Sequence, residues 1–273
     1  VLALITGADG GVVSGLRGLH AWLAVHSPSG RATLIDTDPL GVVLYGDVQS
    51  FSRADKQRLL EGLRALARQH AGFRWQDWSA SPFGALSTPE MEPVFRDILT
   101  SPHRDEAQQA MVDCVLDALR HGPVQPSLDE VLLAVVREGD RWPGVRSGAL
   151  KVYLRSWPRD PAPHLKLLDH IHSGQVEDRE DELLGMLLDT LYPGHISIRR
   201  LLDHLHPPKR PSLIGTYFYF WSERLANKLA SDDLPVLLDE LVKRRLPLDL
   251  THEYHYREMV GALLVRGIEM YGE

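Results

Sequence analysis

The sequence predicts an all-α protein made of stacked antiparallel helix pairs, an α-solenoid of the HEAT or armadillo type. From about residue 50 onward, almost every apolar stretch repeats at helical spacing. Helix start and stop signals separate these stretches, and the short connections between them favour antiparallel packing of successive helices. Candidate strands are short and confined to residues 1–6, 32–35 and 42–45.

The first helices are predicted from their caps and their apolar stripes. The helix over 53–70 carries Leu59 and Leu63 on one face and begins at Ser52, a residue placed to cap it. Thr88 directly precedes Pro89, and a capping residue before a first-turn proline is a typical helix start. Together with the later stripes, these signals predict helices near 14–26, 53–70, 89–99, 104–121, 128–137, 143–156, 162–172, 179–192, 197–206, 213–229, 232–245 and 252–271.

The later helices have equally clear boundaries. Ser127 and Glu130 form a capping-box pattern, in which the serine caps the helix and the glutamate reaches back to the cap. Proline-containing pairs end the helical runs, because proline lacks the backbone N–H that a helix interior needs. These pairs are Gly122-Pro123, Trp157-Pro158, Pro207-Pro208 and Leu246-Pro247.

A period of about 50 residues runs through the second half of the chain. The acidic helix openings Asp129-Glu130, Asp181-Glu182 and Asp232-Asp233 are 52 and 51 residues apart, and the turns at Trp142-Pro143 and Tyr192-Pro193 are 50 apart. Such a helical hairpin buries its apolar stripe only by stacking on a neighbour. We therefore expect a helical segment with a glycine-rich start over 1–125 and helical-hairpin repeats over 126–273.

Composition excludes several classes of protein. The 273 residues are 44% hydrophobic and 25% charged, which is typical of a globular chain and excludes a disordered one. The formal net charge of −7 makes nucleic acid an unlikely partner. One cysteine, Cys114, and no apolar run of about 20 residues favour a cytoplasmic protein outside the membrane. Because the chain begins at Val1 and its pattern stops abruptly at Glu273, we expect a piece of a longer protein.

The glycine-rich start resembles the first strand and glycine turn of a short-chain dehydrogenase. Thr6 and Gly7 would form the turn, and Asp36 stands where a ribose-binding acid would be needed. However, Val13 occupies a required glycine position, and no tyrosine is followed by a lysine four residues later. An NAD(P)-dependent oxidoreductase is therefore a remote alternative, and the preferred interpretation is a flexible loop or tight turn leading into the first helix.

No other motif indicates catalysis or metal binding. None of the six lysines follows a glycine, so the segment has no Walker site for a nucleotide. The closest histidine pairs, 170/172, 204/206 and 252/255, lack a third ligand, and side chains two apart on a helix point about 200° apart. Nucleophile motifs such as GxSxG are also missing. We assign no catalytic, cofactor-binding or metal-binding residue to this segment.

The segment 206–221 places a basic, proline-rich turn before five consecutive aromatic residues. Because tyrosine, tryptophan and arginine are favoured interface anchors, this segment is a candidate contact surface for a partner. The alternative is a helix held in the core, with its two basic residues solvated. The candidate interaction residues are Arg199, Arg200, Lys209, Arg210, Tyr217, Tyr219 and Trp221.

Three stretches carry a family resemblance: 38–47 (DPLGVVLYGD), 181–193 (DELLGMLLDTLYP) and 207–217 (PPKRPSLIGTY), the last followed by Phe220-Trp221. In these stretches the chain resembles bacterial NACHT-type STAND NTPases, specifically the helical-repeat region after their nucleotide-binding module. The family consists of large multidomain proteins, many associated with antiphage defence. The resemblance implies that the NTP site, and hence ATP, belongs to a part of the parent protein N-terminal to this segment.

We therefore expect a non-catalytic helical scaffold or sensor module of a larger STAND-type NTPase. It would act through contacts with neighbouring domains of the same protein or with a protein partner, and the full-length protein could form oligomers. The alternative is a free-standing helical-repeat adaptor that binds a partner protein. A GxxxxGK[ST] motif encoded upstream would favour the first hypothesis, and a start codon immediately before Val1 would favour the second.

Overall fold

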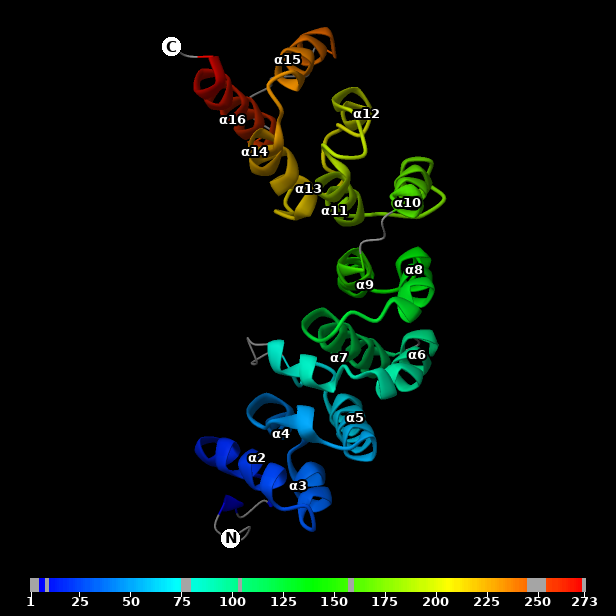
Figure 1. The fold of residues 1–273 in the computed structure, drawn as a ribbon, viewed down its shortest axis with the longest axis vertical. Coiled ribbons are helices and arrows are strands. Elements are labelled where there is room, and N and C mark those ends of the chain that lie inside the picture. The colour runs from blue at the N-terminus through cyan, green and yellow to red at the C-terminus, as the bar shows by residue number, and fades with distance from the viewer. Residues whose placement is uncertain are drawn as a thin grey trace. The chain divides into compact units, whose positions relative to one another are not determined.

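The computed structural model describes residues 5–7, 10–74, 80–102, 105–156, 160–244 and 254–271 (Figure 1). These residues are mostly helical, and their only β pairing is an isolated antiparallel bridge between Thr6 and Val12. The all-α prediction is confirmed. Two compact units, Val1–Trp157 and Pro158–Glu273, make up the chain, and this division falls later than the boundary expected after residue 125.

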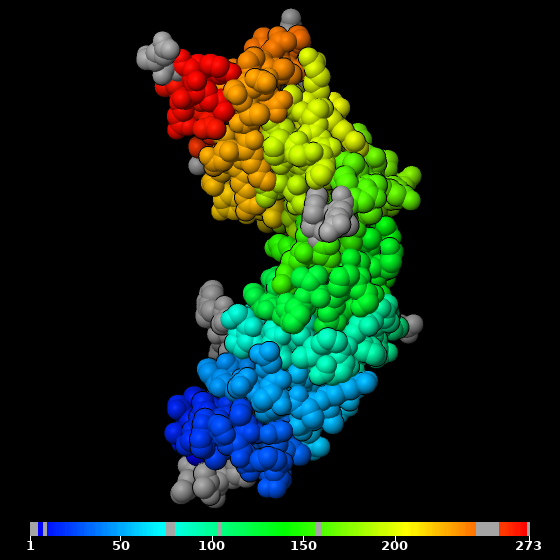
Figure 2. All heavy atoms as spheres, in the orientation of Figure 1, coloured from blue at the N-terminus to red at the C-terminus, as the bar shows by residue number. Residues whose placement is uncertain are grey.

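Unit 1 contains two rows of helices (Figure 1). In one row α2 packs on α4 and α7 packs on α9, and the 3-10 helix η3 lies between α4 and α7 and contacts both. In the other row α3 packs on α5, and α6 packs on α8. In Figure 2 the atoms of successive segments of this unit lie against one another. The α-helices are α2 (Arg17–His26), α3 (Arg31–Thr37), α4 (Pro39–Tyr45), α5 (Arg53–Gln69), α6 (Glu92–Thr100), α7 (Glu106–His121), α8 (Asp129–Arg137) and α9 (Pro143–Arg155). The 3-10 helices are η1 (Ser14–Leu16), η2 (Val48–Ser50), η3 (Ser81–Leu86), η4 (Pro89–Met91) and η5 (Pro126–Leu128).

The predicted caps differ in outcome. The Ser52 side chain accepts a hydrogen bond from the backbone N–H of Asp55, so the start of α5 is confirmed. The capping box predicted at Ser127 and Glu130 does not form. Residues 126–128 make a 3-10 turn that runs directly into α8, so Ser127 lies within the helical path instead of before it.

Two of the three candidate strands are helices. Residues 32–35 lie within α3 and residues 42–45 within α4. Val42 and Val43 are fully buried on α4, so tertiary packing outweighs the strand preference of this β-branched run. Of the third candidate, residues 1–4 lie outside the described part of the chain.

The first residues of α4 explain why residues 39–45 form a helix. Its first residue is Pro39, and the Asp38 carboxylate accepts a hydrogen bond of 2.8 Å from the backbone N–H of Gly41. The same carboxylate forms an ion pair with Arg17 of α2 at 2.7 Å. Asp38 therefore both caps α4 and ties it to α2.

The glycine-rich start folds into a tight turn. The backbone N–H of Gly7 donates to the carbonyl oxygen of Gly11 at 2.8 Å, and Gly10 adopts a φ of +80°, which glycine accommodates readily. The described residues include no parallel sheet on which a dinucleotide could bind. Asp36 instead forms an ion pair with Arg58 of α5. The described residues therefore lack the parallel sheet that the oxidoreductase alternative requires.

Unit 2 packs its helices around α11 and the aromatic segment (Figure 1). Within it α10 contacts α11, α11 contacts α13 and η6, α12 contacts α15, and α16 contacts η6 and α14. The helix predicted over 213–229 contains a π-helical turn, η6, in place of regular α-helix. The elements are α10 (Ala162–His172), α11 (Glu182–Leu191), α12 (Ile198–Leu202), α13 (Thr216–Tyr219), η6 (Phe220–Arg224), α14 (Leu225–Lys228), α15 (Asp233–Arg244) and α16 (Tyr254–Tyr271).

The motifs of the 50-residue period begin helices, but the spans between them hold more than one helix pair. Asp129, Glu182 and Asp233 are the first residues of α8, α11 and α15. However, α10 follows α9 before the second opening, and α13, η6 and α14 follow α12 before the third. The turn expected at Leu246-Pro247 lies outside the described residues. Among the described helices, none is long and apolar enough to cross a membrane.

Candidate functional site

The candidate interaction residues of the basic and aromatic segment do not form one exposed surface. Tyr217 and Trp221 are only 2% and 1% exposed, whereas Tyr219 is 38% exposed. Tyr217 and Trp221 therefore belong to the core of unit 2, which corrects their assignment to a contact surface. Sequence alone could not separate them from Tyr219, because five consecutive aromatics surround a helix on all sides.

The four candidate cations are also paired within unit 2. Each guanidinium or ammonium group lies next to a carboxylate from a different element of the unit. The ion pairs are Arg199–Glu240 at 2.9 Å, Arg200–Asp169 at 2.7 Å, Lys209–Asp181 at 2.9 Å, and Arg210–Glu180. Because these pairs already neutralise the four charges, the four residues offer little unpaired positive charge to a partner.

Asp181 is at the centre of this network. Its side chain is fully buried, and its backbone has a φ of +58°, a conformation that side-chain-bearing residues rarely adopt. One carboxylate oxygen lies 2.9 Å from the Lys209 ammonium, and the other accepts a hydrogen bond of 2.8 Å from the Lys209 backbone N–H. The ammonium also donates to the carbonyl oxygen of Asp178 at 2.7 Å. Lys209 therefore provides most of the compensation for the buried negative charge of the Asp181 carboxylate.

Further hydrogen bonds join the start of α13 to the residues after α12 and to Glu182. The Tyr217 hydroxyl donates toward the carbonyl oxygens of His204 and His206, at 3.0 and 2.8 Å. The Glu182 carboxylate accepts a hydrogen bond of 2.6 Å from the backbone N–H of Thr216. We call residues 178–182 together with 206–217 the clamp. Its charged and polar groups pair with one another, so the clamp holds the elements of unit 2 together.

A histidine contact joins α10 to the residues after α12. The rings of His172 and His204 lie 4.7 Å apart, edge to face. Burial lowers the pKa of His204 to about 4, and the neighbouring His172 and Arg200 act in the same direction. The two histidines are 32 residues apart in the sequence, so spacing does not indicate this contact, which depends on tertiary packing.

We expect the chain to lose stability as the pH falls below about 6.5. An unfolded histidine titrates near 6.5, so between 6.5 and 4 the unfolded state binds a proton that buried His204 does not. His204 then lowers the free energy of unfolding by about 2 kcal/mol between pH 7 and pH 5. Burial also lowers the pKa of His20 and His164, which adds to the loss. Urea unfolding at a series of pH values across this range measures the effect. A smaller slope of unfolding free energy against pH in His204→Phe gives the contribution of His204. An unfolding free energy independent of pH would contradict the prediction.

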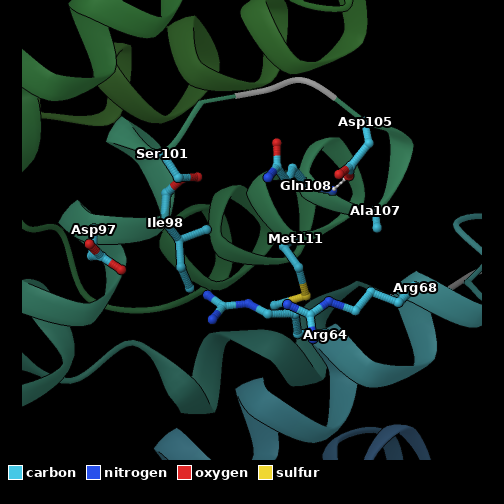
Figure 3. Close-up of a pocket in the computed structure, with 9 residues that line it drawn as sticks. All are labelled: Arg64, Arg68, Asp97, Ile98, Ser101, Asp105, Ala107, Gln108 and Met111. Carbon is cyan, nitrogen blue, oxygen red and sulfur yellow. Dashed lines mark hydrogen bonds between the residues drawn. The ribbon is translucent and has the colours of Figure 1, made fainter.

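Unit 1 contains a pocket that sequence analysis missed, enclosed by α5, α6 and α7 (Figure 3). Its volume is about 230 Å³. We call it the α5–α7 pocket. Arg64 and Arg68 extend side by side across its floor beside Met111, and Asp97 and Asp105 stand at its edges. The lining residues are Arg64, Arg68, Asp97, Ile98, Ser101, Asp105, Ala107, Gln108 and Met111.

The sequence carried one signal for this pocket. Arg64 and Arg68 are four residues apart on α5, and like charges at this spacing repel each other by a few tenths of a kcal/mol unless something compensates them. The elements that close the pocket, α6 and α7, come later in the chain, so sequence spacing could not show it. Within the described part of the chain, no three histidine, cysteine or acidic side chains are grouped to hold a metal ion.

Comparison with protein-family models, with curated proteins and with solved structures gave no match.

Proposed function

We propose that the chain is a non-catalytic helical scaffold or sensor module of a larger, cytoplasmic STAND-type NTPase. It acts through contacts with neighbouring domains or with a protein partner, and its stacked helix pairs form a HEAT-like solenoid. Nucleotide binds in another part of the parent protein. The proposal is supported by the two rows of helices in unit 1 and by the resemblance of 181–193 and 207–217 to that family.

The observation that carries the proposal is an exposed apolar stripe on α16. Four large apolar side chains of this helix are each more than half exposed, and Figure 2 shows α16 at the surface of unit 2. Their spacing places them on one helix face, and contiguous exposed apolar surface is characteristic of protein contacts. The stripe consists of Leu264, Val265, Ile268 and Tyr271, at 58%, 57%, 71% and 58% exposure.

The test compares the chain and its Ile268→Glu variant in binding the remainder of the full-length gene product. We expect the variant to bind at least about tenfold more weakly, because a charge on the stripe opposes burial of apolar surface. Its circular dichroism should be unchanged, since Ile268 is 71% exposed. Glu258→Gln, an exposed change on the same helix, is the control. Equal binding by Ile268→Glu, or ATP turnover by the purified chain that persists after repurification, would contradict the proposal.

A further inference from the structure

The α5–α7 pocket contains two arginines that form no ion pair with the two aspartates at its edges. Among the described residues, Arg64 and Arg68 have no hydrogen-bond or ion-pair partner. Two other charged residues of α5 are paired, because Arg58 contacts Asp36 and Asp55 lies 3.0 Å from Arg31. Two adjacent guanidiniums that reach into one cavity provide forked donors suited to an oxyanion.

The rest of the pocket limits which anion fits. Its floor includes Ile98 and Met111, both 2% exposed, so a ligand must bring methylene groups as well as charge. Asp97 and Asp105 stand at the edges, where they repel a doubly charged phosphate more strongly than a singly charged carboxylate. A glutamate side chain carries both the aliphatic stem and the single charge.

A shallow groove extends the pocket along α5 and α6. This groove has a volume of about 350 Å³ and shares Arg64, Asp97 and Ile98 with the pocket. Beyond them Leu60 and Pro93 supply apolar surface, and Gln57 offers an amide that can hydrogen-bond a peptide backbone. Glu61 also lines the groove, and its carboxylate repels an acidic side chain there, so the glutamate of a bound segment must enter the pocket and leave neutral residues in the groove. An extended segment can therefore lie in the groove while one of its side chains enters the pocket.

We propose that the α5–α7 pocket binds the carboxylate of a glutamate side chain from an extended acidic segment of a partner protein. Arg64 and Arg68 hold the carboxylate, and Ile98 and Met111 contact the methylene groups. This proposal rests on the function proposed above, and it names the chemistry of one partner surface.

The experiment measures fluorescence anisotropy of a rhodamine-labelled peptide in which glutamate alternates with valine. We expect Arg64→Glu and Arg68→Glu each to weaken binding to the whole chain by at least about tenfold, because each places a carboxylate where the ligand carboxylate binds. Glutamine in place of every glutamate should weaken peptide binding by a similar factor. Arg53→Glu, an exposed reversal at the start of α5, is the matched control and should change the affinity by less than about twofold.

Three outcomes would overturn the pocket assignment: equal binding of the glutamine peptide, unchanged binding by both reversed arginines, or tighter binding of a phosphoserine peptide. Thermal melting checks each variant, and Arg64→Gln or Arg68→Gln replaces the reversal at the same position if that reversal fails to fold. The α16 experiment separates the two proposals. If the acidic peptide does not bind but Ile268→Glu still loses its partner, the pocket assignment fails and the scaffold function stands.

Discussion

Replacing Gly185 with alanine is expected to lower the free energy of unfolding by about 4 kcal/mol, near the top of the range for single substitutions. Gly185 lies in α11 where the start of α13 crosses it. A Cβ atom at this position would lie 2.2 Å from the backbone nitrogen of Tyr217 and 2.5 Å from the carbonyl carbon of Thr216. These are backbone atoms, so no side-chain rotation relieves the clash and the two helices must separate.

The separation would also weaken the clamp. Glu182, three residues before Gly185, accepts hydrogen bonds from Thr216 through its carboxylate at 2.6 Å and its backbone carbonyl at 2.7 Å. Moving α13 away stretches both bonds, and each contributes about 1 kcal/mol. Steric overpacking and lost hydrogen bonds together give the expected size of the effect.

Urea unfolding of Gly185→Ala measures this prediction, with Gly261→Ala as the matched control. Gly261 lies inside α16, and a Cβ atom there meets nothing within 4 Å. Alanine is the better helix former, so the control should stabilise the chain by up to about 1 kcal/mol. The close approach of α11 and α13 would be contradicted if both variants unfolded at the same urea concentration.

The sequence was sufficient where structure depends on local signals. The helix α5 follows from its leucine stripe and the Ser52 cap, because both act within a few residues of the chain. It was insufficient where a helix depends on burial. The run Val42–Val43 indicated a strand, yet the Asp38-Pro39 start in the same stretch was a helix signal that could have corrected it.

The candidate site depended on contacts that sequence spacing does not encode. Lys209 was expected to be solvated or to face a partner, and the structure places its ammonium on Asp181, an acid from an earlier helix opening. The sequence marks Asp181 only as part of an acidic helix opening, whereas the structure shows its carboxylate bound to both the ammonium and the backbone N–H of Lys209. Arg64 and Arg68 became a candidate site only because α6 and α7 close over them.

Replacing Lys209 with methionine is expected to lower the free energy of unfolding by about 3 kcal/mol. Asp181 is fully buried, and without the ammonium its carboxylate retains one hydrogen bond of 2.8 Å, from the backbone N–H of residue 209. Removing one partner of a buried ion pair destabilises by about 3 to 5 kcal/mol. The Lys209 side chain is 46% exposed, so water reaches the site and the loss falls at the low end.

Urea unfolding at pH 7.5 tests this prediction against Lys166→Met. Lys166 is exposed on α10, so its substitution should change the free energy of unfolding by less than about 0.5 kcal/mol. The double variant Asp181→Asn with Lys209→Met should recover at least half of the loss. Asparagine keeps an acceptor for the backbone N–H of residue 209, tolerates the φ of +58° at position 181, and buries no charge. If the double variant were no more stable than Lys209→Met alone, the lysine would act through packing of its aliphatic stem, and the buried charge would not be the reason that the clamp needs it.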